Sequence, residues 1–121
     1  MVEYASEAAQ LLSKKGILAE VINMRFVKPM DFECLDDIAN HFRKVVTIEE
    51  SSLVGGFGTG VLEYFAEKGY KSEVLRIGLP DHFIEHGTQK ELHAMLGIDP
   101  KGIADKTTSF VRSGLNKGVA V

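Results

Sequence analysis

Two patterns of apolar residues alternate along the chain: residues spaced as on one face of a helix, and short continuous apolar runs. They predict helices and strands in turn. Three short runs rich in aliphatic and β-branched residues predict strands at 17–24, 44–48 and 74–77. The alternation of the two patterns predicts an α/β protein with three layers, in which an open, mostly parallel sheet carries helices on both faces. Five stretches with the spacing of a helix face predict helices, two of them with apolar positions over 5–12 and 61–66 and three that start at Asp31, Thr88 and Asp99.

Several of these helices have recognisable end signals. Asp31 is a good N-cap for the second helix, and Thr88 with Glu91 forms a T-x-x-E capping box for the fourth. Asp99, followed by a proline, starts the last helix, which is expected to end near Val111. Glycines are expected to end the first, third and fourth helices at Gly16, Gly69 and Gly97.

The apolar faces also predict which side chains the helices bury. His41 and His93 occupy helix positions that predict solvated side chains. The one cysteine, Cys34, has no neighbouring base and is expected to be a half-buried structural thiol. The residues expected in the core are Leu35, Ile38, Ala39 and Phe42 of the second helix, Val61, Leu62, Phe65 and Ala66 of the third, and Leu92, Met95 and Leu96 of the fourth.

The composition is that of an ordinary globular domain and argues against several classes of function. The 121 residues, 45% hydrophobic and 26% charged, predict one domain over 1–112 and a ragged tail over 113–121. A net charge of −3 without a basic stripe argues against a nucleic-acid partner. One cysteine permits no internal disulfide, and we find neither a membrane-spanning apolar run nor a secretory signal. A soluble, cytoplasmic protein without a membrane partner is therefore expected.

A glycine turn, formed by Gly55, Gly56, Gly58 and Gly60, lies between the second predicted strand and the third helix. Backbone N–H groups at the start of a helix can bind a phosphate, so the turn is a candidate anion site. Its spacing matches neither the P-loop nor G-x-G-x-x-G, because Val61 stands where the last glycine belongs. We favour the alternative, in which the glycines permit a tight turn and close helix–strand packing at a domain or subunit contact.

Two carboxylates, Glu49 and Glu50, end the second predicted strand at the edge where α/β sheets usually bind ligands. Adjacent strand residues point to opposite faces, so these two cannot form a facing catalytic pair. We favour a structural role, in which one of them accepts hydrogen bonds from the following loop. Arg25 follows the first predicted strand. Two roles are open for its side chain: binding a phosphate, or forming an ion pair with one of these glutamates. We favour the ion pair.

Two histidines, His82 and His86, follow the third predicted strand. Their spacing would suit zinc on a helix, but Pro80 interrupts any such helix and the glutamate of H-E-x-x-H is missing, so we predict no metal site. We favour a compact turn in which the histidines cap backbone groups. In the functional alternative, His86 lies with His82 and Asp81 at the mouth of a substrate channel formed with a partner domain.

Four segments in this order carry a resemblance: RFVKP at 25–29, TIEE at 47–50, GGFGTG at 55–60 and LPDHFIEHGT at 79–88. Over about residues 1–111 the chain resembles the C-terminal domain of the 1-deoxy-D-xylulose-5-phosphate synthases, thiamine-diphosphate enzymes of the transketolase family. The resemblance implies part of an enzyme that condenses pyruvate with glyceraldehyde 3-phosphate, with loss of carbon dioxide. The product feeds isoprenoid, thiamine and pyridoxal phosphate synthesis.

In that family thiamine diphosphate and magnesium belong to two upstream domains, whose Gly-Asp-Gly signature is absent from this sequence. The resemblance therefore implies no catalytic residue here, no cofactor bound by this chain and no turnover by the chain alone. It implies upstream catalytic domains and a dimer mate as partners. Candidate interface or channel-mouth residues are Arg25, Glu50, Asp81, His82 and His86.

Two alternatives stay open beside this reading. One is the matching domain of another thiamine enzyme, such as a 2-oxoacid dehydrogenase β subunit, and the other is a free-standing nucleotide-binding module that uses the glycine turn. The family's domain also starts with a strand that this sequence lacks, so an open sheet edge is expected. The terminal run Val119–Val121 is a weak candidate to fill that place.

Overall fold

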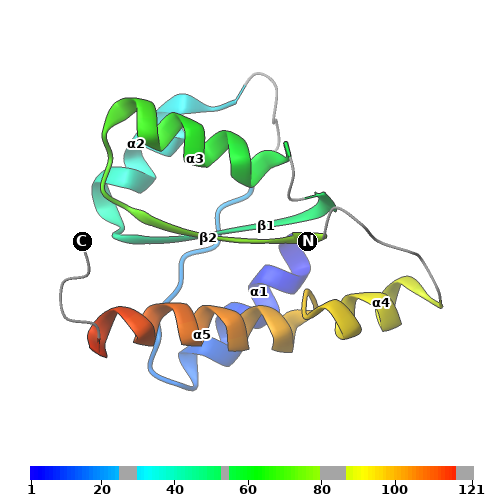
Figure 1. The fold of residues 1–121 in the computed structure, drawn as a ribbon. Coiled ribbons are helices and arrows are strands. Elements are labelled where there is room, and N and C mark those ends of the chain that lie inside the picture. Colours follow the sequence, from blue (N-terminus) through cyan, green and yellow to red (C-terminus); the bar gives the residue numbers. More distant parts are fainter. Residues whose placement is uncertain (25–29, 53–54, 80–86, 117–121) are drawn as a thin grey trace. The chain divides into compact units, whose positions relative to one another are not determined.

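The computed structural model describes residues 1–24, 30–52, 55–79 and 87–116, which fall into two compact units. The first unit spans Ile22–Ile84 and includes Met1, and the second joins Val2–Val21 to Glu85–Val121. Figure 1 shows the helices and strands of both units. Met1 apart, the first unit is continuous along the chain, whereas the second is assembled from the two ends of the sequence.

The first unit contains a small parallel sheet, which confirms the prediction of an α/β protein. Its two strands pair from Lys44 beside Glu73 to Ile48 beside Ile77, and the register then shifts before Ser52. The side chains of Lys44 and Glu73 also form an ion pair at the start of the ladder. In chain order the elements of this unit are α2 (Phe32–His41), β1 (Lys44–Ser52), α3 (Phe57–Lys68) and β2 (Glu73–Leu79).

The core of the first unit forms where α2 and α3 meet. Leu35, Val61 and Phe65 are almost fully buried and form one cluster, as the helical spacing predicts. Burying aliphatic and aromatic side chains in this way is the main contribution to the stability of a small domain. Ala66 is exposed, contrary to the prediction, because it lies on the far side of α3 from this cluster. Half-buried side chains that pack against the cluster include Met24, Met30, Ile38, Ala39, Val45, Phe57, Tyr64, Tyr70 and Val74.

Predicted start and stop signals of helices are confirmed in both units. The Asp31 carboxylate accepts a hydrogen bond from the backbone N–H of Cys34 at 3.0 Å, and the Thr88 hydroxyl accepts one from Glu91 at 3.2 Å. These bonds satisfy N–H groups that have no partner inside the helix. The three glycines expected to end helices all have positive φ, between 72° and 79°: Gly16, Gly69 and Gly97.

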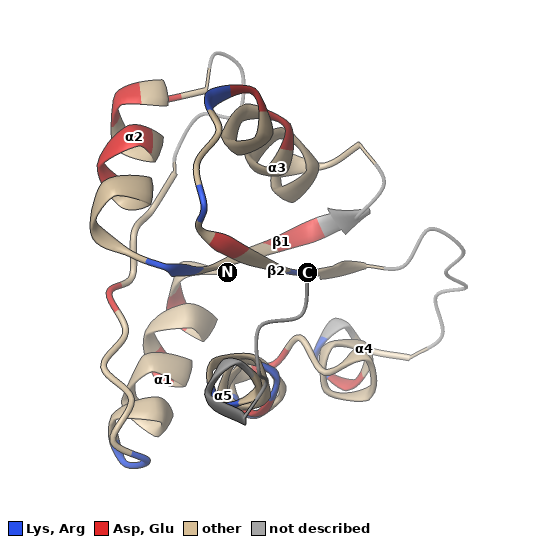
Figure 2. Cartoon of the chain, turned by 60° about the vertical axis from the view of Figure 1, so that its left-hand side comes forward, with Lys and Arg blue, Asp and Glu red and all other residues tan. Residues whose placement is uncertain are grey.

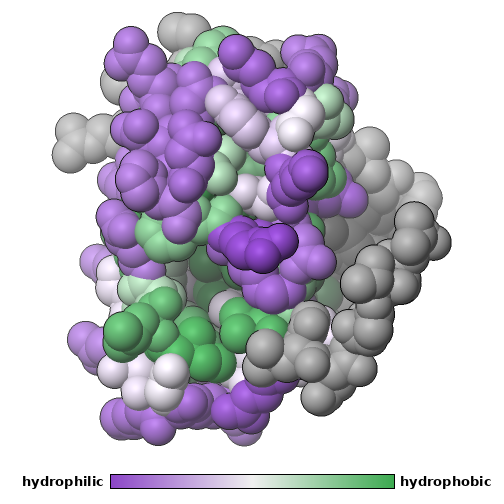
Figure 3. All heavy atoms as spheres, turned by 90° about the vertical axis from the view of Figure 1, so that its left-hand side faces the viewer, coloured by the Kyte–Doolittle hydropathy of each residue, from purple (hydrophilic) through white to green (hydrophobic). Residues whose placement is uncertain are grey.

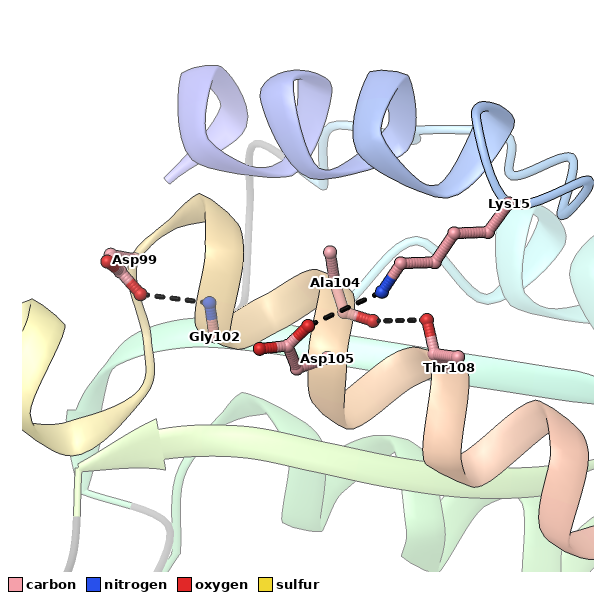
Figure 4. Close-up of polar contacts among 6 residues, drawn as sticks. All are labelled: Lys15, Asp99, Gly102, Ala104, Asp105 and Thr108. Carbon is pink, nitrogen blue, oxygen red and sulfur yellow. Dashed lines mark hydrogen bonds and ion pairs between the residues drawn. The ribbon is translucent and has the colours of Figure 1, made fainter.

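The described residues of the second unit form three helices. The side chains of Lys15, just beyond α1, and Asp105 of α5 form an ion pair at 3.4 Å, as Figure 4 shows. The same figure shows the Asp99 carboxylate accepting a hydrogen bond from the N–H of Gly102 at 2.9 Å, which confirms Asp99 as the start signal. The helices are α1 (Val2–Ser13), α4 (Gln89–Leu96) and α5 (Pro100–Asn116).

Three further predictions about the fold are wrong in the described residues. The segment 17–24 forms no strand, and its Leu18 side chain is 90% exposed, because no described backbone pairs with it. Met95 of α4 is 70% exposed, since the buried face of that short helix is centred on Leu92. The last helix also continues to Asn116, beyond its predicted end near Val111.

Other expectations are not decided by the described residues. The tail prediction for Val119–Val121 lies outside them, and the layering of helices on both faces of the sheet stays a prediction. Within the described ranges, no helix is both long enough and apolar enough to cross a membrane.

Candidate functional site at the start of helix α3

The glycine turn connects the carboxyl end of β1 to the first turn of α3. Gly55 has a φ of 71°, a conformation that side chains disfavour, and Gly56 is the N-cap of α3 in an extended conformation. Gly58 lies buried in the first helical turn, and Gly60 follows on the same helix. The turn therefore brings the start of α3 directly against the edge of the sheet where β1 ends.

Glu49 of β1 is the charged residue that holds this turn. Its side chain is buried, with 8% of the residue exposed, and its Oε2 accepts a hydrogen bond from the backbone N–H of Gly58 at 2.9 Å. The preferred structural role for one of the two glutamates is therefore confirmed, although the donor lies in the helix and not in the loop before it. Glu50 is exposed, as expected for the opposite face of the strand.

Gly58 packs closely against both strands of the sheet. A Cβ at this position would lie 2.6 Å from Oγ1 of Thr47 on β1 and 2.9 Å from Cγ of Arg76 on β2. Nη1 of Arg76 also donates a hydrogen bond to Oγ1 of Thr59, in the first turn of the helix, at 3.0 Å. Glycine at 58 is thus needed for packing, and side chains from both strands contact the same turn of α3.

These contacts bear on the phosphate interpretation of the glycine turn. A helix N-terminus attracts negative charge, and here the Glu49 carboxylate already takes up one of its N–H groups. Oε1 of Glu49 and Oγ1 of Thr47 are buried and have no hydrogen-bond partner among the described residues. The Glu49 carboxylate therefore already places a negative charge at the start of α3, an arrangement better suited to holding the fold together than to binding a second anion.

Sequence reasoning missed a second cluster, in which Asp36 of α2 joins two tyrosines. Oδ1 of Asp36 accepts hydrogen bonds from the hydroxyls of Tyr64 and Tyr70, each at 2.7 Å. The bonds from Tyr70 and Tyr64 lower the pKa of Asp36, and the bond to Asp36 raises the pKa of Tyr64 to about 12. The partners are about 30 residues apart in the chain, so no local pattern predicts their contact.

Acidic side chains concentrate along α2, as Figure 2 shows. They act on Cys34, whose pKa is raised by burial first and then by the charges of Asp31 and Asp37. A raised pKa keeps a thiol protonated and unreactive at neutral pH. Cys34 is half-buried, as predicted. In the described part of the chain, no three His, Cys, Asp or Glu residues come together as metal ligands.

Two histidines differ in their surroundings. His41 is exposed, as predicted, with Nδ1 2.7 Å from the carbonyl oxygen of Asp37. His93 is 6% exposed, so the prediction of a solvated side chain is wrong. Its Nδ1 lies 3.1 Å from the hydroxyl of Tyr4, and the two rings meet edge to face. The reason for the error is this aromatic partner, which comes from α1, far away in the sequence.

The remaining predicted site residues lie outside the described part of the chain. Their proposed roles at an interface or channel mouth, and the pairing of Arg25 with a glutamate, stay predictions. They are Arg25, Asp81, His82 and His86.

Comparison with known proteins gives a consistent family signal. The family model "Transketolase, C-terminal domain" matches residues 1–103. The 1-deoxy-D-xylulose-5-phosphate synthase of Aquifex aeolicus is 46% identical over 113 residues, which cover 93% of this chain and 18% of the relative. A synthase of the same name, numbered 1, from Geobacter sulfurreducens is 49% identical over 108 residues, covering 88% and 17%. This chain therefore spans less than a fifth of the length of these relatives.

Proposed function

Because this chain belongs to the transketolase C-terminal domain family, we propose that it acts as the C-terminal domain of a 1-deoxy-D-xylulose-5-phosphate synthase. The observation that carries the proposal is the identity of 42–49% to proteins of that name over most of this chain. The complete enzyme would join pyruvate to glyceraldehyde 3-phosphate and release carbon dioxide. In that setting the domain would have the three-layer α/β arrangement with helices on both faces of the sheet.

The role proposed for this domain is architectural. The buried Glu49 and the close approach of Gly58 to Thr47 support it, because they fix the loop at the carboxyl end of the sheet. That edge is where α/β folds usually place ligands and neighbouring domains. A rigid turn there would present a fixed surface to the catalytic domains.

Thiamine diphosphate and magnesium would be held by those catalytic domains. The described residues do not fit either group, since they contain no cluster of metal ligands and the Glu49 carboxylate already binds the start of α3. The chain alone is accordingly proposed to be inactive. A homodimer, a cytoplasmic location, and contacts of Arg25, Glu50 and His86 with the catalytic domains or the dimer mate belong to the same proposal.

The two alternative functions have weaker support. The similar relatives carry the name of the synthase and not that of a 2-oxoacid dehydrogenase β subunit. A nucleotide-binding module would need the N–H groups of the glycine turn for phosphate, and one of them is bonded to Glu49.

A domain exchange tests the proposal. We would replace the matching 108 residues of the Geobacter sulfurreducens synthase with this chain and measure formation of 1-deoxy-D-xylulose 5-phosphate. The chimera is expected to be active, whereas a control that carries the corresponding domain of a 2-oxoacid dehydrogenase β subunit is expected to be inactive. A chimera that folds and assembles like the parent but forms no product would contradict the proposal.

Calorimetry tests the assignment of the cofactor to other domains. Thiamine diphosphate with magnesium would be titrated into this chain, after a cooperative thermal transition has shown that the sample is folded. We expect no saturable heat. Saturable heat with one site per chain would mean that this domain binds the cofactor itself, and the glycine turn would then be the first place to mutate.

A further inference from the structure

Phe32, the first residue of α2, is a large apolar side chain that the fold leaves half-exposed. Its exposed fraction is 48%, and its ring lies against the ring of Tyr64 on α3, with the two centroids 4.5 Å apart. Because the ring is held in place, a partner that binds it loses little conformational entropy. A single exposed apolar residue is common on protein surfaces, so the polar groups around Phe32 decide what it can bind.

The polar group nearest along the helix is Asp36, one turn further along α2 on the same face as Phe32. Its Oδ1 accepts the hydrogen bonds from the hydroxyls of Tyr64 and Tyr70, and its Oδ2 takes part in neither bond. Each hydroxyl has one hydrogen and donates it to Asp36, so the two tyrosine oxygens can only accept further hydrogen bonds. The polar atoms beside Phe32 are therefore acceptors without a spare donor.

The surface around this cluster is negatively charged. Within the described residues, no carboxylate of α2 or of its N-cap forms an ion pair. Acidic groups in the first turn stabilise a helix, but Asp36 and Asp37 lie beyond that turn, where this benefit is lost. Figure 3 looks at the side of the molecule on which α2 lies and shows hydrophilic residues gathered over its upper part, with apolar residues between them. The carboxylates are those of Asp31, Glu33, Asp36 and Asp37.

A cation of the same chain already lies at the cluster. Nζ of Lys68 is 5.9 Å from the centre of the Tyr64 ring, a distance at which an aromatic face attracts a positive charge. Lys68 is exposed and forms no ion pair with a described residue, so its side chain is free to give way to another cation. This contact indicates the class of ligand that the cluster attracts, a cation that lies over an aromatic ring.

We propose that Phe32 and Asp36 bind an arginine side chain of a partner protein. A guanidinium group has five N–H donors and no acceptor, which matches a cluster of acceptors. It also stacks on an aromatic ring while it donates to a carboxylate, whereas the ammonium group of lysine is not planar. The guanidinium would lie over Phe32 and donate to Oδ2 of Asp36, and the charges of Glu33 and Asp37 would attract the partner. The inference goes beyond the proposed function and does not rest on it.

Titration with short peptides tests the choice of ligand. Acetyl-Gly-Arg-Gly-amide and its lysine counterpart would be added to the isotope-labelled chain at low ionic strength, and the backbone amide signals followed by NMR. The arginine peptide is expected to bind roughly three- to tenfold more tightly, to shift the signals of residues 32–37 and 64, and to bind more weakly as salt is added. Equal binding of the two peptides would overturn the proposal, because charge alone would then explain it. So would shifts confined to other residues, or no saturable shift.

Three variants test the location of the site. Asp36→Asn removes the charge but keeps an oxygen that can accept the tyrosine hydrogen bonds, and Phe32→Leu keeps an apolar side chain but removes the ring. Each is expected to weaken binding of the arginine peptide by about fivefold or more. Glu7→Gln removes a carboxylate from an exposed position of α1, and this matched control should change the affinity by less than about twofold. Circular dichroism would verify the fold of each variant. Unchanged affinity in both Asp36→Asn and Phe32→Leu would refute the proposal.

Discussion

The carboxylate of Glu49 accepts a hydrogen bond from the backbone N–H of Gly58 at 2.9 Å, which joins the end of β1 to the first turn of α3. The carboxylate is buried and comes from the strand that precedes the helix, so it acts as a capping group supplied by a neighbouring element. Because Gly58 also packs against Thr47, the hydrogen bond and the close contact depend on the same placement of the helix.

Replacing Glu49 with alanine is expected to destabilise the first unit. The change removes the acceptor and leaves the buried N–H of Gly58 without its partner, which should lower the free energy of unfolding by about 1–3 kcal/mol. Urea denaturation followed by circular dichroism would measure this loss. Glu63→Ala, at an exposed position of α3, is the matched control and should change stability by less than about 0.5 kcal/mol. Similar effects of the two changes would argue against the capping role.

A pair of glycine substitutions separates packing from helix propensity. Alanine at 58 would place its Cβ 2.6 Å from Oγ1 of Thr47, and we expect a loss of about 1–3 kcal/mol from overpacking. Alanine at 60 meets the end of the flexible Met30 side chain, so it should be neutral or stabilise by up to about 1 kcal/mol. Thermal unfolding of both variants gives the comparison. A stabilised Gly58→Ala variant would show that the contact with Thr47 yields easily.

The hydrogen bonds from two tyrosine hydroxyls to Asp36 stabilise the fold to an extent that depends on pH. They lower the pKa of Asp36, so folding favours its ionised form, and this stabilisation is lost as the pH falls through the lowered pKa. We expect the double variant Tyr64→Phe, Tyr70→Phe to be less stable than the parent at neutral pH. The difference should shrink progressively below about pH 4. Urea titrations at several pH values would check it, and a difference that does not change with pH would contradict the assignment.

Titration of the tyrosine hydroxyls at alkaline pH tests the same cluster. The bond to Asp36 raises the pKa of Tyr64 to about 12, because it favours the neutral phenol. The stabilisation of the folded state is therefore complete below the ordinary tyrosine pKa and disappears as the pH rises through about 12. In an Asp36→Asn variant, tyrosinate absorbance should develop at lower pH than in the parent. Superimposable titration curves would show that Asp36 does not control the ionisation of Tyr64.

The contact between Tyr4 and His93 predicts a smaller effect in the second unit. Tyr4→Phe keeps the ring that meets His93 edge to face but removes the hydroxyl 3.1 Å from its Nδ1. We expect a loss of about 1 kcal/mol, the usual contribution of one such hydrogen bond. Differential scanning calorimetry would measure it, with Glu3→Gln on the exposed side of α1 as a control. An unchanged melting temperature would assign the stabilising contact to the rings alone.

Sequence reasoning succeeded where the cause is local. Asp31, Thr88 and Asp99 cap helices as predicted, because a cap and the N–H group that it satisfies are three residues apart. The prediction that a glutamate at the end of β1 accepts a hydrogen bond from the segment that follows it is also confirmed. The donor, Gly58, is nine residues away in the first turn of α3, and not in the loop where the sequence predicts it.

The predictions that are wrong share one cause, because each depends on contacts between segments that are far apart in the sequence. Residues 17–24 have the composition of a strand, but a strand exists only where another backbone pairs with it. The helical spacing around His93 predicts an exposed side chain. The residue that helps to bury it, Tyr4, is 89 residues earlier in the chain, so no local pattern indicates the contact. The cluster around Asp36 was missed for the same reason, since α2 and the residues around α3 meet only in the folded unit.

The assembly of the second unit from both ends of the chain sets an order of events during synthesis. The first unit is nearly continuous, so all of its residues are synthesised before α5. Lys15, by contrast, contacts Asp105 across a separation of 90 residues. At translation rates of about 5–20 residues per second, α1 therefore waits for several seconds without the helix that it pairs with. Of the helices in the second unit, the one that is synthesised first is therefore among the last to find its place.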